Sequence, residues 1–192
     1  MSQLVTDILP YLEREAPRYT SYPTAHHFTE TVNASVHSQW LGALKEDDHV
    51  AVYVHIPFCN ELCWFCGCHT KMTKRYEPIA AYVKVLLKEI AQLKNHTGGR
   101  GKLTQIHFGG GSPSLLQSDD LIAILDAIAT SFEFTPPGEL AIELDPRTTT
   151  PENIALYSSL GFNRVSIGIQ DFDPVVQAAI NRIQPFSMVS GV

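Results

Sequence analysis

Residues 50–66 read VAVYVHIPFCNELCWFC, and this stretch decides the expected fold. Its first half, residues 50–56, is an almost uninterrupted apolar run that predicts a buried strand. Its second half carries Cys59, Cys63 and Cys66 in a loop that follows the strand directly. Active sites of β/α folds lie at the carboxyl ends of the strands, so the cysteines stand where a functional site is expected.

Strands and helices alternate from this stretch onward. In chain order we predict a strand at 50–56, a helix at 76–94, a strand at 105–108, a helix at 119–131, a strand at 140–144, a helix starting at Thr150-Pro151, a strand at 165–169 and a helix at 174–181. Such alternation implies parallel strands with right-handed crossovers, as in a β/α barrel or an open α/β sheet.

Four strands are too few for a closed eight-stranded barrel, which takes about 250 residues. The predicted fold is therefore α/β, a partial β/α barrel truncated after about four strand–helix units. Residues 1–48 are expected to form an N-terminal lead-in, with a short helix within residues 32–44. Residues 49–192 are expected to form the N-terminal part of the barrel, with the remaining strands and a C-terminal domain absent.

The composition argues against three classes of protein: nucleic-acid-binding, membrane-spanning and secreted proteins. The chain has 192 residues and a formal net charge of −6, with no run of Lys and Arg that would form a basic face for nucleic acid. No stretch approaches the roughly 18 apolar residues of a membrane span. Residues 1–10 lack the features of a secretory signal, so the sequence predicts a cytoplasmic protein.

The four cysteines lie together between positions 59 and 68. A disulfide framework would spread its cysteines along the chain, so this crowding indicates a metal or redox site. The spacing of Cys59, Cys63 and Cys66 is C-x3-C-x2-C, and three thiolates in one loop can hold three irons of a cubane cluster. The fourth iron is then open to a chelating molecule with an amino and a carboxylate group, such as S-adenosylmethionine (SAM).

A zinc site is the alternative reading of the cysteines. Zinc prefers four thiolate or imidazole ligands, usually as two separated pairs, and Cys68 or His69 could complete such a set. The spacing after a buried strand favours the cluster. Cys68 is expected to be a spare thiol near it, with a fourth-ligand role as the minority interpretation.

The stretch from Tyr53 to Cys68 resembles the family of oxygen-independent coproporphyrinogen III oxidases (coproporphyrinogen dehydrogenases) of haem biosynthesis, which are radical SAM enzymes. Further motifs that resemble this family occur in the same order along the chain: residues 17–25 (PRYTSYPTA), 107–113 (HFGGGSP), 143–147 (ELDPR), 161–164 (GFNR), 168–172 (GIQDF) and 181–182 (NR). Members of the family continue well beyond this chain.

The resemblance implies oxidative decarboxylation of two propionate side chains of coproporphyrinogen III to vinyl groups, giving protoporphyrinogen IX. It implies a [4Fe–4S] cluster, two SAM molecules, a porphyrinogen substrate, an electron donor such as a flavodoxin or ferredoxin, and a monomer.

The resemblance also implies roles for residues outside the cluster. Cys59, Cys63 and Cys66 would hold the iron. The first SAM would be contacted by Tyr53, Gly110 and Glu143, and the second by Phe65, Gly111, Ser112, Gln170 and Arg182.

The residues alone leave other readings open. Tyr53 could be a core aromatic, Glu143 could pair with Arg147 or Arg164, and the glycine run could be a tight turn. Arg182 could be a surface residue, and His55 is expected to be a structural histidine.

Two whole-protein alternatives remain beside the enzyme. One is a haem-binding or haem-transfer protein that keeps the cluster loop, and the other is a catalytically inactive fragment. Arg18 and Tyr19 could touch substrate propionates.

Overall fold

A computed structural model describes residues 23–192, except for the side chains of Pro136 and Pro137. The chain divides into two compact units, residues 1–37 and 38–192. In the first unit the structure describes the 3₁₀ helix η1 (Ala25–His27) and the start of α2 (Ala34–Gly42). Most of the 17–25 motif, including Arg18 and Tyr19, lies outside the described residues.

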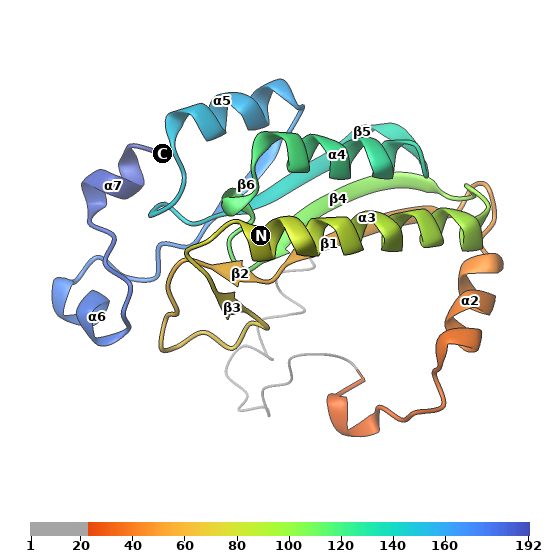
Figure 1. Cartoon of the computed structure of the whole chain (residues 1–192), viewed down its shortest axis with the longest axis horizontal. Coiled ribbons are helices and arrows are strands. Elements are labelled where there is room, and N and C mark those ends of the chain that lie inside the picture. The colour runs from red at the N-terminus through yellow and green to blue at the C-terminus, as the bar shows by residue number, and fades with distance from the viewer. Residues whose placement is uncertain (1–22) are drawn as a thin grey trace, which may run out of the picture. The chain divides into compact units, whose positions relative to one another are not determined.

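The second unit is built on a four-stranded sheet in the order β1-β4-β5-β6 (Figure 1). Its strands are β1 (His49–Ile56), β4 (Lys102–Gly110), β5 (Glu133–Leu144) and β6 (Arg164–Ile167). Every neighbouring pair is parallel. The predicted parallel α/β sheet is thereby confirmed.

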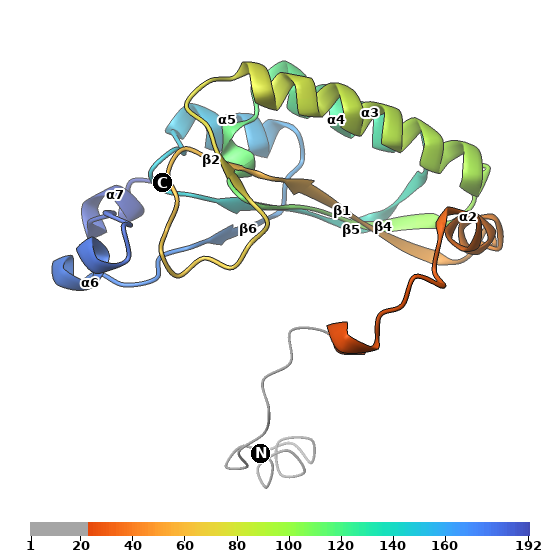
Figure 2. The ribbon, with the colours of Figure 1, turned by 60° about the horizontal axis from the view of Figure 1, so that its bottom comes forward.

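Three longer helices connect these strands: α3 (Glu77–Thr97), α4 (Ser118–Ala129) and α5 (Pro151–Ser159). All three lie on one face of the sheet (Figure 2). An open doubly wound sheet carries helices on both faces, whereas a β/α barrel carries them only outside the ring of strands. The one-sided arrangement is therefore that of part of a barrel.

The core fills the space between the sheet and these helices. Val54, Ile56, Phe108 and Ile142 are almost fully buried on the strands. They belong to one apolar cluster with Ile79, Val83, Leu86 and Ile90 of α3 and with Leu121, Ile124 and Ile128 of α4. The residues that alternate with the core positions, including Tyr53, His107 and Glu143, point to the opposite face of the sheet.

Local sequence features explain where two of the helices begin or end. Gly98, with a φ of 63°, ends α3 in the left-handed conformation that glycine favours. Thr150 caps α5, because its side chain accepts a hydrogen bond from the backbone N–H of Asn153 while the Asn153 side chain accepts one from the backbone of Thr150. The helix start predicted at Thr150-Pro151 is confirmed.

The third strand is longer than predicted. β5 begins at Glu133, and the register with β4 shifts between Leu103 and Gln105, opposite the Pro136-Pro137-Gly138 segment. Proline cannot donate to a sheet ladder, so this segment hides the first half of the strand from pattern reasoning.

Several short elements were not predicted: β2 (Phe58–Cys59), β3 (Lys71–Met72), η2 (Pro113–Leu115) and α7 (Phe186–Ser190). They are too short to show periodicity. The predicted last helix is α6 (Pro174–Ala179).

In the part of the chain that the structure describes, no helix has both the length and the apolar character needed to cross a membrane.

Candidate iron–sulfur and SAM site

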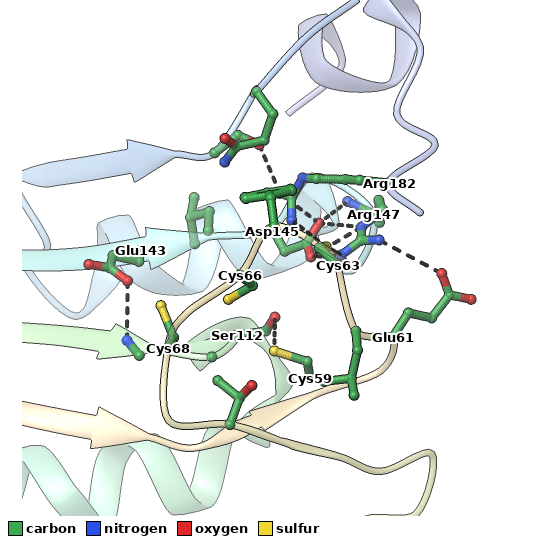
Figure 3. Close-up of a pocket in the computed structure, with 18 of the residues that line it drawn as sticks. Cys59, Glu61, Cys63, Cys66, Cys68, Ser112, Glu143, Asp145, Arg147 and Arg182 are labelled. Carbon is green, nitrogen blue, oxygen red and sulfur yellow. Dashed lines mark hydrogen bonds and ion pairs between the residues drawn. The ribbon is translucent and has the colours of Figure 1, made fainter. Parts of the chain in front are cut away.

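A pocket of about 320 Å³ opens beyond the carboxyl ends of the strands. Its walls come from the cysteine loop, from the segments that follow β4 and β6, and from the last residues of β5 and those after it (Figure 3). The sequence places functional residues at these strand ends, and the pocket gathers most of them.

All four cysteines line the pocket. β2 and β3 pair in parallel, and the backbone N–H of Thr73 donates to the carbonyl of Cys59 at 2.9 Å, so the two ends of the cysteine loop are joined. The middle of the loop is joined to the segment after α6. There Trp64 N–H donates to the Ile180 carbonyl at 3.0 Å, and the Asn181 side chain donates to the Leu62 carbonyl at 2.7 Å.

Hydrogen-bond donors converge on two of the cysteine sulfurs. The Ser112 hydroxyl, which is buried, donates to Cys59 Sγ at 3.8 Å. Burial raises the pKa of the Cys59 thiol, and the Ser112 hydrogen bond opposes that rise. Cys63 Sγ faces Arg147 Nη2 at 3.5 Å and Arg182 Nη1 at 3.6 Å (Figure 3).

Asp145 holds both arginines. Arg147 Nη2 lies 2.6 Å from Asp145 Oδ2, and Arg182 Nη2 lies 3.5 Å from Asp145 Oδ1. Burial alone would raise the pKa of Asp145, but the hydrogen bonds from Arg147 and the charge of Arg182 outweigh it and hold that pKa below its usual value. The carboxylate therefore stays ionised and fixes the two guanidinium groups.

Arg182 is a buried residue, only 8% exposed, so the surface reading of this residue is wrong. Its Nε donates to Gln184 at 2.8 Å, and its Nη2 donates to the Gly168 carbonyl at 2.8 Å. Gln170 also lines the pocket and has a φ of 66°, the left-handed region that non-glycine residues seldom adopt.

The glycine run after β4 brings backbone close to the cysteine loop. Gly111 N–H donates to the Ile56 carbonyl at 2.8 Å, and a side chain on Gly111 would collide with the backbone of Phe58. Gly110 has a φ of 107°, and a Cβ there would lie 2.6 Å from the His55 ring. These positions require glycine.

Glu143 lines the pocket from β5. Its Oε1 lies 3.1 Å from His107 Nε2, and its Oε2 accepts a hydrogen bond from Gly110 N–H at 3.2 Å. The alternative ion pairs are wrong, because Arg147 is bound by Asp145 and Arg164 Nη1 pairs with Glu139 at 2.9 Å. Glu143 is thus a half-exposed carboxylate that, among residues 23–192, has no ion pair with a Lys or Arg side chain.

Phe65 lines the pocket and is about half exposed, whereas Tyr53 does not line it. Tyr53 is 56% exposed, so the core reading of this residue is wrong. Its ring stacks on that of His107 with centroids 5.8 Å apart, and its hydroxyl lies 3.1 Å from His55 Nδ1. His55 Nε2 lies 2.9 Å from the His69 carbonyl, so both of its ring nitrogens have protein partners, as expected of a structural histidine.

The donor set fits an iron–sulfur cluster better than a single metal ion. Within residues 23–192, no three His, Cys, Asp or Glu side chains converge as a single metal ion would require. A cubane takes one thiolate on each of three irons, so its ligands need only surround a shared space. Cys59, Cys63 and Cys66 do so around the pocket, where buried Arg147 Nη1 also has no hydrogen-bond partner.

Residue-by-residue reasoning missed part of the site. Asp145, Arg147 and Glu61 line the pocket but were given no role there. A signal was present for two of them, because Asp145 and Arg147 follow the third strand directly, as the cysteines follow the first.

Comparison with known proteins is consistent with this geometry. A family model described as the radical SAM superfamily matches residues 53–190. Oxygen-independent coproporphyrinogen III oxidase from Bradyrhizobium diazoefficiens is 43% identical over 182 residues, covering 95% of the chain and 40% of that protein. The protein of the same name from Helicobacter pylori strain J99 is 41% identical over 180 residues, covering 92% of the chain and 39% of that protein.

A solved structure is also similar to this chain. Coproporphyrinogen III oxidase (HemN) from Escherichia coli, described as a radical SAM enzyme, superposes with a TM-score of 0.82 at 33% identity. The match covers 96% of the present chain and 40% of that one. The chain thus spans about 40% of the length of these relatives.

Proposed function

The chain belongs to the radical SAM superfamily, and from this premise we propose that it holds a [4Fe–4S] cluster on Cys59, Cys63 and Cys66 and binds SAM beside it. The proposal depends on one observation: the same pocket is lined by these three cysteines, Glu143 and Arg182. When bound, the cluster supplies the electron that cleaves the sulfonium of SAM to methionine and a 5′-deoxyadenosyl radical.

The residues of the chain have separate tasks in this proposal. Glu143 offers a carboxylate whose orientation is fixed by Gly110 and His107, and such a group suits the ribose hydroxyls of the first SAM. Tyr53 would contact the same SAM from the uncovered face of the sheet.

A second SAM is proposed on the other side of the pocket. Arg182 would attract its carboxylate, and Gly111 would let the main chain approach it closely. Phe65, Ser112 and Gln170 would complete this second site. The aromatic ring of Phe65 also shields the cluster ligands from water, which influences the cluster potential.

The substrate we propose is coproporphyrinogen III. Support comes from relatives named oxygen-independent coproporphyrinogen III oxidase, which are 38–43% identical to the chain over almost its whole length. The proposed reaction is an oxidative decarboxylation. Each of two propionates would lose one hydrogen atom, CO₂ and one electron and become a vinyl group; bound SAM would supply the hydrogen acceptor and an external acceptor would take the electron. An electron donor such as a flavodoxin or ferredoxin and a monomeric state are part of the proposal.

The proposal is tested by anaerobic reconstitution with iron and sulfide, followed by electron paramagnetic resonance (EPR) of the reduced protein with and without SAM. A [4Fe–4S]⁺ signal that shifts on addition of SAM is expected, because SAM would bind an open iron. Retention of zinc with no cluster signal would contradict the proposal. Release of 5′-deoxyadenosine that depends on coproporphyrinogen III tests the substrate, and haem binding without this release would support a haem-transfer protein instead.

A further inference from the structure

Cys63 has an environment that differs from those of the other cysteines. Its sulfur faces two guanidinium groups, those of Arg147 at 3.5 Å and Arg182 at 3.6 Å. Cys59 instead receives a neutral hydroxyl from Ser112, at 3.8 Å. Hydrogen bonds from charged donors are roughly twice as strong as those between neutral groups. Cys63 is therefore the sulfur on which the protein exerts its strongest polar influence among these contacts.

The Arg147 guanidinium is held rigidly in this position. Its Nε and Nη2 lie 3.0 Å and 2.6 Å from the two carboxylate oxygens of Asp145, which is a bidentate pair (Figure 3). The backbone N–H of Arg147 also donates to Asp145 Oδ1, at 3.0 Å. A guanidinium group is not deprotonated in proteins, so this donor remains charged.

The buried charges around Cys63 do not cancel, because the one further carboxylate near Arg147, that of Glu61, lies 3.7 Å from Nη1 on a side chain that is 56% exposed. Asp145 supplies one negative charge, whereas Arg147 and Arg182 supply two positive charges, and all three side chains are at most 13% exposed. Little water is available to screen the remaining charge from the sulfur. The triad thus presents a net cationic group to one cluster ligand.

The Nη1 atom of Arg147 makes an ion pair but no hydrogen bond. This atom is buried, and the carboxylate oxygen of Glu61 lies 3.7 Å away. A buried N–H without a partner costs about 1–3 kcal/mol, so Nη1 is a donor that the described contacts leave unused at the pocket wall.

We propose that Arg147 is a positioning residue that sets the reduction potential of the cluster by donating to the Cys63 sulfur. Reduction adds a negative charge to the cluster, and a cationic donor on a ligand sulfur stabilises that reduced form. Hydrogen bonds to the sulfurs and solvent exposure are the means by which proteins set such potentials. Arg147 therefore raises the potential and makes the cluster easier to reduce. The inference rests on the proposed cluster.

The test is an EPR-monitored redox titration of the full chain after anaerobic reconstitution, without SAM. Arg147→Gln removes the charge, and Arg147→Lys keeps the charge but loses the two-pronged geometry. We expect Arg147→Gln to disfavour reduction by about tenfold, which lowers the potential by about 59 mV for a one-electron couple. Arg147→Lys is expected to lie between this variant and the unsubstituted chain.

Arg164→Gln is the matched control, because it removes the same charge from a residue that pairs with Glu139 outside the pocket. The reduction potential of the cluster in Arg164→Gln is expected to equal that in the unsubstituted chain. An unchanged potential in Arg147→Gln with full iron content would overturn the inference, as would loss of the cluster in both Arg147 variants. Absence of a cluster in the unsubstituted chain would instead defeat the proposed function.

Discussion

The carboxylate of Glu143 on β5 accepts a hydrogen bond from the main-chain N–H of Gly110 at the end of β4, at 3.2 Å. His107 holds the other oxygen of the same carboxylate at 3.1 Å. The group is thus oriented by its neighbours while one side of it faces the pocket. A ligand with hydroxyl groups would find the acceptor already in place, with no side-chain entropy left to lose.

Glu143→Ala is therefore expected to weaken SAM binding without loss of iron. A hydrogen bond to a charged group contributes about 1.5–3 kcal/mol, which corresponds to roughly ten- to hundredfold weaker binding. Anaerobic calorimetry with parallel iron analysis measures both quantities. Glu139→Ala is the control, because Glu139 lies on the same strand but pairs with Arg164 outside the pocket. Unchanged SAM affinity in Glu143→Ala would reduce this residue to a structural role.

The cysteine ligands give a second prediction. Cys59→Ala, Cys63→Ala and Cys66→Ala are each expected to abolish the cluster, because each would leave one iron without its thiolate. Cys68→Ala serves as the control within the same loop and is expected to retain iron near the normal level. The measurement is iron and sulfide content after reconstitution. If Cys68→Ala lost iron as completely as the others, the ligand set assigned here would be wrong.

Thr150 provides a test of local stability beside the site. Thr150→Ala removes the side chain that caps α5, and we expect a loss of about 1 kcal/mol in the free energy of unfolding. Ser159→Ala at the other end of α5 removes a hydroxyl that donates to the Leu156 carbonyl in an exposed position. This control is expected to change stability by about 0.5 kcal/mol or less. Urea denaturation followed by circular dichroism compares the two variants, and equal losses would contradict the capping role.

The buried Tyr157 should make the free energy of unfolding depend on pH in the alkaline range. Burial raises the pKa of Tyr157 from 10.0 to about 12. A raised pKa in the folded state favours the protonated form, so this contribution to stability is fully present below pH 10 and is lost as the pH rises towards 12. At pH 11 the loss is about 1.4 kcal/mol. Tyr157→Phe has no phenol to ionise, so the stability of the unsubstituted chain should fall by that amount relative to Tyr157→Phe between pH 9 and pH 11.

Urea titrations at the two pH values measure this change, because every other titrating group is shared by both proteins. A difference that stays constant with pH would mean that the phenol is able to ionise in the folded state.

Pattern reasoning located the four parallel strands and three connecting helices, because each has a strong periodic or capping signal. It also identified the family, since the motifs at residues 107–113 and 143–147 occur in order with the cysteine loop. The assigned roles of the site residues stay predictions.

The contacts within the site could not be predicted, because they join distant positions. Arg182 lies 119 positions after Cys63, and its burial depends on Gly168 and Gln184 folding around it. The alternative ion pairs of Glu143 with Arg147 or Arg164 were wrong for a related reason. Arg147 is four residues away in sequence, but it turns to Asp145, while His107 on the adjacent strand comes within reach only through the register of the sheet.

The hydrogen bonds that join the cysteine loop to Ile180 and Asn181 have a consequence for the biosynthesis of the protein. The loop leaves the ribosome well before the residues that shape it, since Asn181 follows Leu62 by 119 positions. Contacts of such long sequence separation cost loop-closure entropy before they can form. Until then the cysteines are open thiols on a growing chain, exposed to oxidants and to stray metal ions. Loading of the proposed cluster therefore requires Ile180 and Asn181 to have folded onto the loop, and until then the thiols depend on reducing surroundings.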